Sequence, residues 1–133
     1  MLKINKYNKQ LFTRRSVVQF VYQNMFNFQS LNEVKADNEF FHICDEALFD
    51  LLVLNINLNW ETVFDQVNEI LKNDYDKFVL SKMFYAILIS AFVDLQLKQH
   101  LHNKKQIIFE YIKIAEMFIK DDKKILNAVL SRI

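Results

Sequence analysis

Three groups of side chains in this sequence are of types that perform chemistry or bind metals. His42, Cys44 and Asp45 lie close together, but residues two apart on a helix point in different directions and would not share a metal. We therefore interpret Cys44 as a small buried hydrophobic residue. His100 and His102 lie among lysines without a third ligand nearby, which favours a solvated basic loop over a zinc site. Neither group predicts a metal centre.

The third group offers no better basis for catalysis. Asp121 and Asp122 are adjacent carboxylates, but at the start of a predicted helix they are explained as capping and dipole-complementing residues. The sequence has no glycine, which excludes the phosphate loop, the dinucleotide fingerprint and the nucleophile elbow, because each needs a backbone free of side chains. We expect a protein that is not an enzyme and holds no cofactor.

Basic side chains are concentrated at the amino-terminal end. Residues 1–32 contain five basic and no acidic residues, whereas the remaining residues contain twelve basic and sixteen acidic ones. The five are Lys3, Lys6, Lys9, Arg14 and Arg15. Arg14 and Arg15 fall in the first turn of a predicted helix, where the helix dipole disfavours cations. This segment therefore predicts a phosphate-binding arm, with a solvated tail as the alternative.

Apolar residues at three- and four-residue spacing predict helices along most of the chain. The absence of glycine and proline argues against tight hairpins and hence against a sandwich or barrel. The predicted helices are one that Thr13 caps, one that carries Phe40 to Leu51, one that Asn59 caps, a long region from Asn73 to Gln96 that is kinked or divided, one that Asn103 caps, and one that starts at Asp121. The expected fold is an all-α, single-domain bundle of five to seven helices over residues 1–133, with residues 1–12 as a flexible basic start.

The composition is that of a soluble globule. Hydrophobic residues make up 52% and charged residues 25% of the sequence. The longest apolar stretch, Met83 to Val93, is far shorter than the roughly 20 residues that a membrane-spanning helix needs, so we interpret it as a buried helix. The first residues do not form a secretory signal, and the single cysteine cannot form an internal disulfide. We expect a cytoplasmic protein.

Two parts of the sequence, taken together, resemble the NusB transcription-antitermination family. Residues 14–23, Arg-Arg-Ser-Val-Val-Gln-Phe-Val-Tyr-Gln, are similar to its amino-terminal motif of an arginine, an apolar stretch, a glutamine and a Leu-Tyr-Gln-like triplet. Segments 88–95, 107–118 and 126–130 follow its carboxy-terminal helices in order. Two positions depart from the family pattern: Phe109 replaces the usual Asn before the matched Glu110, and Ala128 replaces a glycine.

The resemblance implies a helical bundle that pairs with the small-subunit ribosomal protein NusE on the boxA element of ribosomal RNA transcripts. Such a pair binds single-stranded RNA and acts on the RNA polymerase elongation complex indirectly. By motif, the resemblance nominates Arg14, Tyr22 and Asn127 as RNA-binding residues, with a core position as the equal alternative for Tyr22. Charge and proximity in sequence add Lys9, Arg15, Lys123 and Lys124. We expect a monomer or a weak homodimer.

Two other functions are compatible with the same sequence. One is a NusB-like protein-interaction or accessory domain without RNA specificity of its own, as in ribosomal RNA methyltransferases that carry such a domain. No cofactor-binding domain accompanies the helices, so we do not expect a complete methyltransferase. The other is a small helical regulator or enzyme unrelated to RNA. Binding of boxA-like RNA, with and without the ribosomal partner, distinguishes the three.

Overall fold

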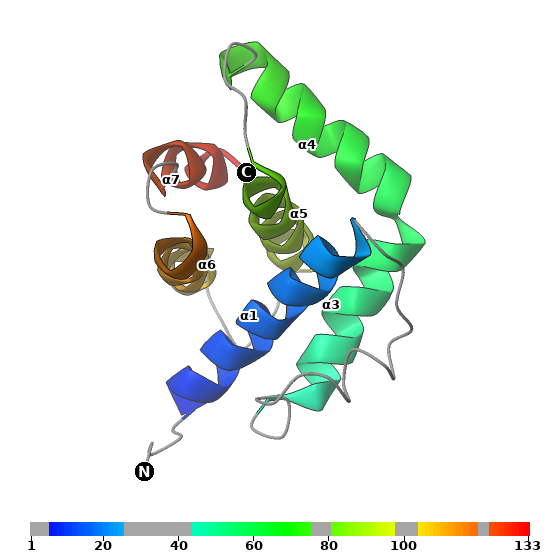
Figure 1. Cartoon of the computed structure of the whole chain (residues 1–133), viewed down its shortest axis with the longest axis vertical. Helices are drawn as coiled ribbons and strands as arrows, with labels where there is room; N and C mark the ends of the chain where they lie inside the picture. Colours follow the sequence, from blue (N-terminus) through cyan, green and yellow to red (C-terminus); the bar gives the residue numbers. More distant parts are fainter. Residues whose placement is uncertain (1–5, 26–43, 76–80, 98–103, 120–122) are drawn as a thin grey trace.

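The computed structural model describes residues 6–25, 44–75, 81–97, 104–119 and 123–133. In these ranges the chain forms six α-helices and no β-strand (Figure 1). The helices are α1 (Lys6–Asn24), α3 (Glu46–Leu58), α4 (Trp60–Tyr75), α5 (Lys82–Gln96), α6 (Lys104–Phe118) and α7 (Lys123–Ser131). The predicted all-α bundle is confirmed. His42, His100, His102, Asp121 and Asp122 lie outside the described residues.

Helix α5 lies at the centre of the bundle and contacts all five other helices of the described chain (Figure 1). Every residue from Ala86 to Asp94 is buried. Ser81 caps the helix by accepting a hydrogen bond from the backbone N–H of Phe84 at 3.1 Å, and the buried hydroxyl of Ser90 donates to the carbonyl of Ala86 at 2.7 Å. The apolar stretch is thus a core helix, as expected. No helix of the described chain is long and apolar enough to cross a membrane.

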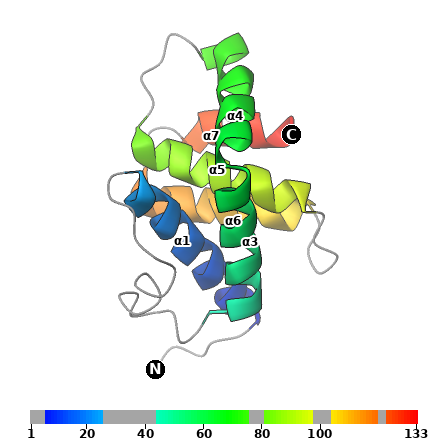
Figure 2. The ribbon, with the colours of Figure 1, turned by 90° about the vertical axis from the view of Figure 1, so that its right-hand side faces the viewer.

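Helices α3 and α4 run nearly end to end along one side of the molecule (Figure 2). Asn59 joins them: its backbone N–H donates to the carbonyl of Asn55 at 3.2 Å and closes α3, while its own carbonyl accepts from the N–H of Val63 at 2.8 Å. The sequence predicted Asn59 as the cap of the helix that follows, whereas the structure makes it the C-cap of α3, and its side-chain amide also donates to the carbonyl of Asn55 at 3.0 Å. Helix α4 buries only a narrow stripe, in which Val67 is fully enclosed.

The start of α1 corrects one expectation. The helix begins at Lys6 rather than at Thr13, so residues 6–12, which the sequence assigned to a start ahead of the helix, are helical, while residues 1–5 lie outside the described chain. Thr13 does not cap the helix because its hydroxyl is used within the bundle. It donates to the carbonyl of Lys9 at 2.7 Å and accepts from the backbone N–H of Asp45 at 2.7 Å.

Two further helix starts differ from the prediction. Asp45, which the sequence grouped with possible metal ligands, caps α3 by accepting from the N–H of Leu48 at 3.1 Å. Cys44 precedes the helix and is buried, as predicted, whereas Leu51, which the spacing assigned to the core, is 40% exposed. The long region expected from Asn73 is divided, because α4 continues to Tyr75 and α5 begins at Lys82.

Substitution of a fully buried residue of α6 tests the core. Ile114 is 0% exposed, so Ile114→Asp places a carboxylate among apolar neighbours and should lower the free energy of unfolding by at least about 3 kcal/mol. Met117 on the same helix is 49% exposed, and Met117→Asp should change it by about 0.5 kcal/mol or less. Urea denaturation of both variants measures the difference; equal midpoints would show that this face of α6 is not core.

Candidate functional site

Arg14, which sequence reasoning assigned to RNA, is the largest fully buried side chain of the described chain. Its Nε donates to Asp94 Oδ2 at 2.6 Å, and its Nη1 donates to Glu110 Oε2 at 2.5 Å. The three side chains come from α1, α5 and α6. A guanidinium that is 0% exposed cannot contact a phosphate, so the prediction of Arg14 as an RNA-binding residue is wrong.

Tyr111 completes this buried polar cluster. Its hydroxyl donates to Asp94 Oδ2 at 2.8 Å. Burial strongly raises the pKa of Tyr111, so the hydroxyl stays protonated at neutral pH and available as a donor. Burial alone would lower the pKa of Arg14, but the charge and hydrogen bond of Asp94, together with Tyr111 and Glu110, more than offset this and raise it, so the guanidinium stays charged. We call Arg14, Asp94, Glu110 and Tyr111 the buried ion cluster.

The carboxyl group of Glu110 is a titratable member of the buried ion cluster. Burial raises the pKa of its carboxyl above the ordinary 4.5, and the charge and hydrogen bond of Arg14 offset only part of that increase. The cluster therefore places two carboxylates around one guanidinium, and one of them retains its proton to a higher pH than an exposed glutamate does. The polar groups of the cluster bind one another inside the bundle and link α1, α5 and α6.

The remaining amino-terminal candidates do not converge on one site. Lys9 is exposed near the start of α1, about 20 Å along the helix from Tyr22. Arg15 is partly buried, and its guanidinium lies 5.7 Å from the ring centroid of Phe118 on α6. Tyr22 is also partly buried and packs against the core. The structure thus leaves Lys9 open to solvent and gives Arg15 and Tyr22 contacts within the bundle.

The carboxy-terminal candidates lie together. Lys123, Lys124 and Asn127 are all exposed on α7, and their spacing puts them on one face of that helix. Lys123 Nζ is 2.6 Å from Glu116 Oε1, and this hydrogen bond lowers the pKa of Glu116. The ion pair places the start of α7 beside the outer face of α6.

The outer face of α6 continues this basic surface, and sequence reasoning missed it. Lys105, Phe109 and Lys113 are exposed at four-residue spacing, which puts them on one stripe. The ammonium of Lys113 lies 5.0 Å from the ring centroid of Phe109. The four-residue spacing of Lys105, Phe109 and Lys113 could have revealed this stripe, but attention went to the apolar residues that repeat on the other side of the same helix. We define the basic face as Lys105, Phe109, Lys113, Lys123, Lys124 and Asn127.

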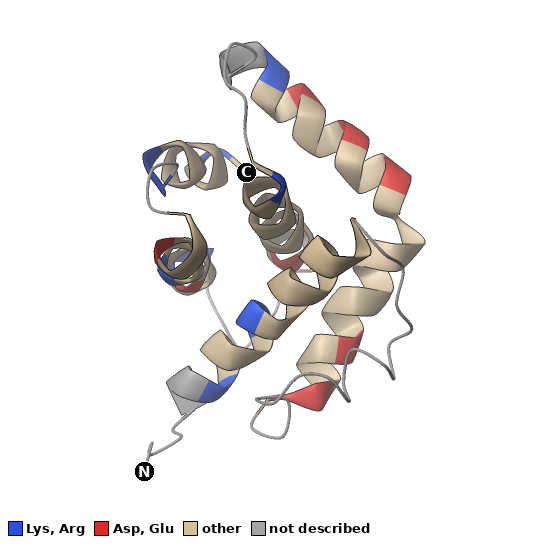
Figure 3. Cartoon of the chain, in the orientation of Figure 1, with Lys and Arg blue, Asp and Glu red and all other residues tan. Residues whose placement is uncertain are grey.

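Acidic side chains gather on the other side of the bundle (Figure 3). Over residues 46–72, α3 and α4 carry five carboxylates and one lysine: Glu46, Asp50, Glu61, Asp65, Glu69 and Lys72. On α6 and α7 the only exposed carboxylate is Glu116, which Lys123 already pairs. Negative charge is therefore concentrated on α3 and α4 and positive charge on α6 and α7, although the net charge of the chain is only +1.

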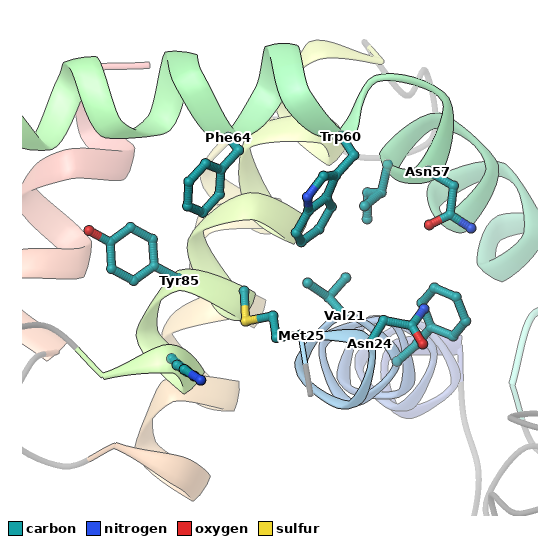
Figure 4. Close-up of a pocket in the computed structure, with 10 residues that line it drawn as sticks. Val21, Asn24, Met25, Asn57, Trp60, Phe64 and Tyr85 are labelled. Atoms are coloured by element: carbon teal, nitrogen blue, oxygen red, sulfur yellow. The ribbon is translucent and has the colours of Figure 1, made fainter. Parts of the chain in front are cut away.

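A pocket of about 910 Å³ opens beside this acidic side (Figure 4). Trp60 and Phe64 stack with their ring centroids 6.2 Å apart, and Tyr85 lies 6.1 Å from Phe64. Val21 of α1 and Met25, the residue that follows this helix, face these rings across the pocket. The lining is mainly apolar and aromatic, which suits an apolar side chain or ligand.

Neither a metal site nor a known relative adds to this picture. The described residues contain no group of three or more His, Cys, Asp or Glu side chains placed to hold a metal ion. No protein-family model matches the sequence, and no curated protein is similar enough to it to count as a match. The geometry of the basic face, the acidic side and the pocket therefore carries the functional argument.

Removal of the buried guanidinium tests the ion cluster. Arg14→Met leaves the carboxylates of Asp94 and Glu110 without their cation, which should lower the free energy of unfolding by about 3 to 5 kcal/mol. Lys9→Met removes an exposed charge from the same helix and should change it by about 0.5 kcal/mol or less. Chemical denaturation of both variants gives the comparison. Equal stabilities would mean that Arg14 is solvated in solution.

The titration of Glu110 gives a pH dependence of known sign. Because its pKa is higher in the folded than in the unfolded protein, the folded state binds more protons above pH 4.5. The stability that this group contributes is therefore present below that pH and is lost as the pH rises through the folded-state pKa. Hence the difference in unfolding free energy, wild type minus Glu110→Gln, should decrease as the pH rises.

Glu116→Gln is the matched control for this titration. In the wild type the hydrogen bond from Lys123 lowers the pKa of Glu116. The stability that Glu116 contributes is therefore present above pH 4.5 and is lost as the pH falls. The difference curves of the two variants, measured by denaturation over a pH series, should slope in opposite directions. Parallel curves would contradict the assigned shifts.

Proposed function

We propose that this chain is an RNA-binding transcription antitermination factor of the NusB type, which pairs with a NusE-type ribosomal protein on boxA-like single-stranded RNA. The observation that carries the proposal is the basic face of α6 and α7 opposite an acidic side formed by α3 and α4. The sequence motifs that resemble the family supply the choice of RNA and partner. On this proposal the protein acts on nascent transcripts in the cytoplasm.

The basic face has the composition that binding of single-stranded RNA requires. Lys105, Lys113 and Lys124 present ammonium groups to solvent, and such groups neutralise phosphates and attract RNA over several ångströms. Asn127 supplies an exposed amide, a group that can hydrogen-bond to an unpaired base. On this proposal Lys123, Lys124 and Asn127 are RNA-binding residues, as the sequence suggested, and Lys105 and Lys113 are added to them.

The acidic side supports the protein half of the proposal. A ribosomal protein binds RNA and is therefore rich in basic residues, which complement Glu61, Asp65 and Glu69. The pocket beside them gives an apolar side chain of such a partner a site lined by Trp60 and Phe64. Electrostatic complementarity of this kind speeds association and fixes orientation. RNA and protein would then occupy separate sides of the bundle.

The same acidic side and pocket favour the second candidate function, an interaction domain without RNA specificity. In that case the chain would bind the NusE-type protein but not boxA-like RNA. The two functions therefore differ in one measurement, the affinity of the free protein and of the complex for RNA. Neutral substitutions on the basic face separate them further, because they should weaken RNA binding and leave partner binding unchanged.

Two lysines, one on each helix of the basic face, provide the test. Lys113→Gln combined with Lys124→Gln removes two phosphate contacts, so the slope of log affinity against log salt should fall in magnitude by about 1.4. Anisotropy titrations with labelled boxA-like RNA, with and without the partner, measure this slope. The control is Lys72→Gln, at an exposed lysine of α4, which should leave the slope unchanged. A basic-face variant that keeps the wild-type affinity and slope would refute this RNA site.

A further inference from the structure

We infer that Phe109 is a stacking platform for an unpaired RNA base, held between two lysines that bind the flanking phosphates. The inference rests on the proposed function and deepens it, because it assigns a base contact to a surface that otherwise offers mainly charge. Phe109 is 54% exposed on α6, with Lys105 one turn before it and Lys113 one turn after it.

The setting of Phe109 differs from that of every other large exposed hydrophobic residue in the described chain. The large exposed hydrophobic residues of the described chain, Phe109 included, are Leu51, Leu54, Leu58, Phe64, Phe109 and Met117. The first four lie on α3 and α4 among carboxylates, where a polyanion is repelled. Of the six, Phe109 alone has a lysine four residues away on both sides. An aromatic ring between cations is the arrangement that single-stranded nucleic-acid grooves use.

The local chemistry favours a base over an apolar protein partner. The ammonium group of Lys113 lies 5.0 Å from the ring centroid of Phe109. An apolar partner that covered the ring would therefore also bury this ammonium group, which costs free energy. An RNA strand avoids this cost because its phosphates pair with the ammonium while its base covers the ring. Stacking tolerates any base, since each has a π-face.

Phe109 also lies where the chain departs from the family that it resembles. The usual residue before the matched Glu110 is Asn, and here a phenyl ring replaces the amide. The neighbouring Glu110 is held inside by Arg14, which fixes the roll of α6 and directs position 109 to solvent. The ring at position 109 is therefore on the surface, while its neighbour Glu110 belongs to the buried ion cluster.

Variants of the full-length chain test the stacking contact against two labelled single-stranded oligoribonucleotides, one boxA-like and one of uridines only. Phe109→Ala should weaken binding of both by about fivefold to a hundredfold, the range of one lost base–ring stack. The salt slope should not change because no charge is lost. Phe109→Trp should restore the affinity, whereas Phe109→Leu should not. The matched control is Leu54→Ala, which truncates a similarly exposed apolar side chain on α3 and should leave RNA affinity unchanged.

Each outcome decides between the inference and the function on which it rests. If boxA-like RNA binds and Phe109→Ala matches the wild type, the stacking role is overturned and the proposed function stands. If both oligonucleotides bind equally and both depend on the ring, stacking stands and boxA recognition fails. If neither binds, both are overturned. Equal affinities of the Leu and Trp variants, or an effect of Phe109→Ala on the protein partner alone, would also overturn the stacking role. Thermal denaturation confirms that each variant is folded.

Discussion

The buried charge of Arg14 is the constraint on which the arrangement of the other helices depends. A guanidinium inside a bundle is tolerated only if carboxylates and hydrogen bonds surround it. Asp94 and Glu110 meet this need, and both are buried with it. Because the three residues belong to α1, α5 and α6, the ion pairs can form only when these helices adopt one mutual register. A purely apolar interface would accept small shifts and rotations more readily.

The internal use of Arg14 also changes where the protein carries positive charge at its surface. The sequence concentrates basic residues at its amino-terminal end, but α1 packs against α3, α5 and α6, and its arginines are drawn into those contacts. Lysines of α6 and α7 supply the exposed cations instead. Helix α5 separates them from the acidic α3 and α4 (Figure 3). The separation of positive and negative charge therefore follows from which helices pack together, and the net charge does not reveal it.

The helices themselves could be predicted from the sequence because apolar residues repeat at the helical period. This repeat is local and does not depend on which other helices pack against it. The role of Arg14 could not be predicted, because its partners lie 80 and 96 residues away. One local sign was present: Arg14 is on the same stripe as Val17, Val18 and Val21, all buried. The exposed Leu51 shows the converse limit, since apolar spacing predicts a helix face but not whether another helix covers it.

Glu110 of the buried ion cluster and Phe109 of the basic face lie on different sides of α6, and the position of the first determines that of the second. Adjacent helical residues point about 100° apart, so a rotation of α6 by one position would exchange Glu110 for Phe109 at the guanidinium. The ion pair with Arg14 forbids that rotation. It thereby keeps Phe109 and the two lysines at four-residue spacing from it directed outward. On the proposed function, Arg14 therefore contributes to RNA binding without touching RNA, because it sets the orientation of the helix whose other side carries Phe109 and its two lysines.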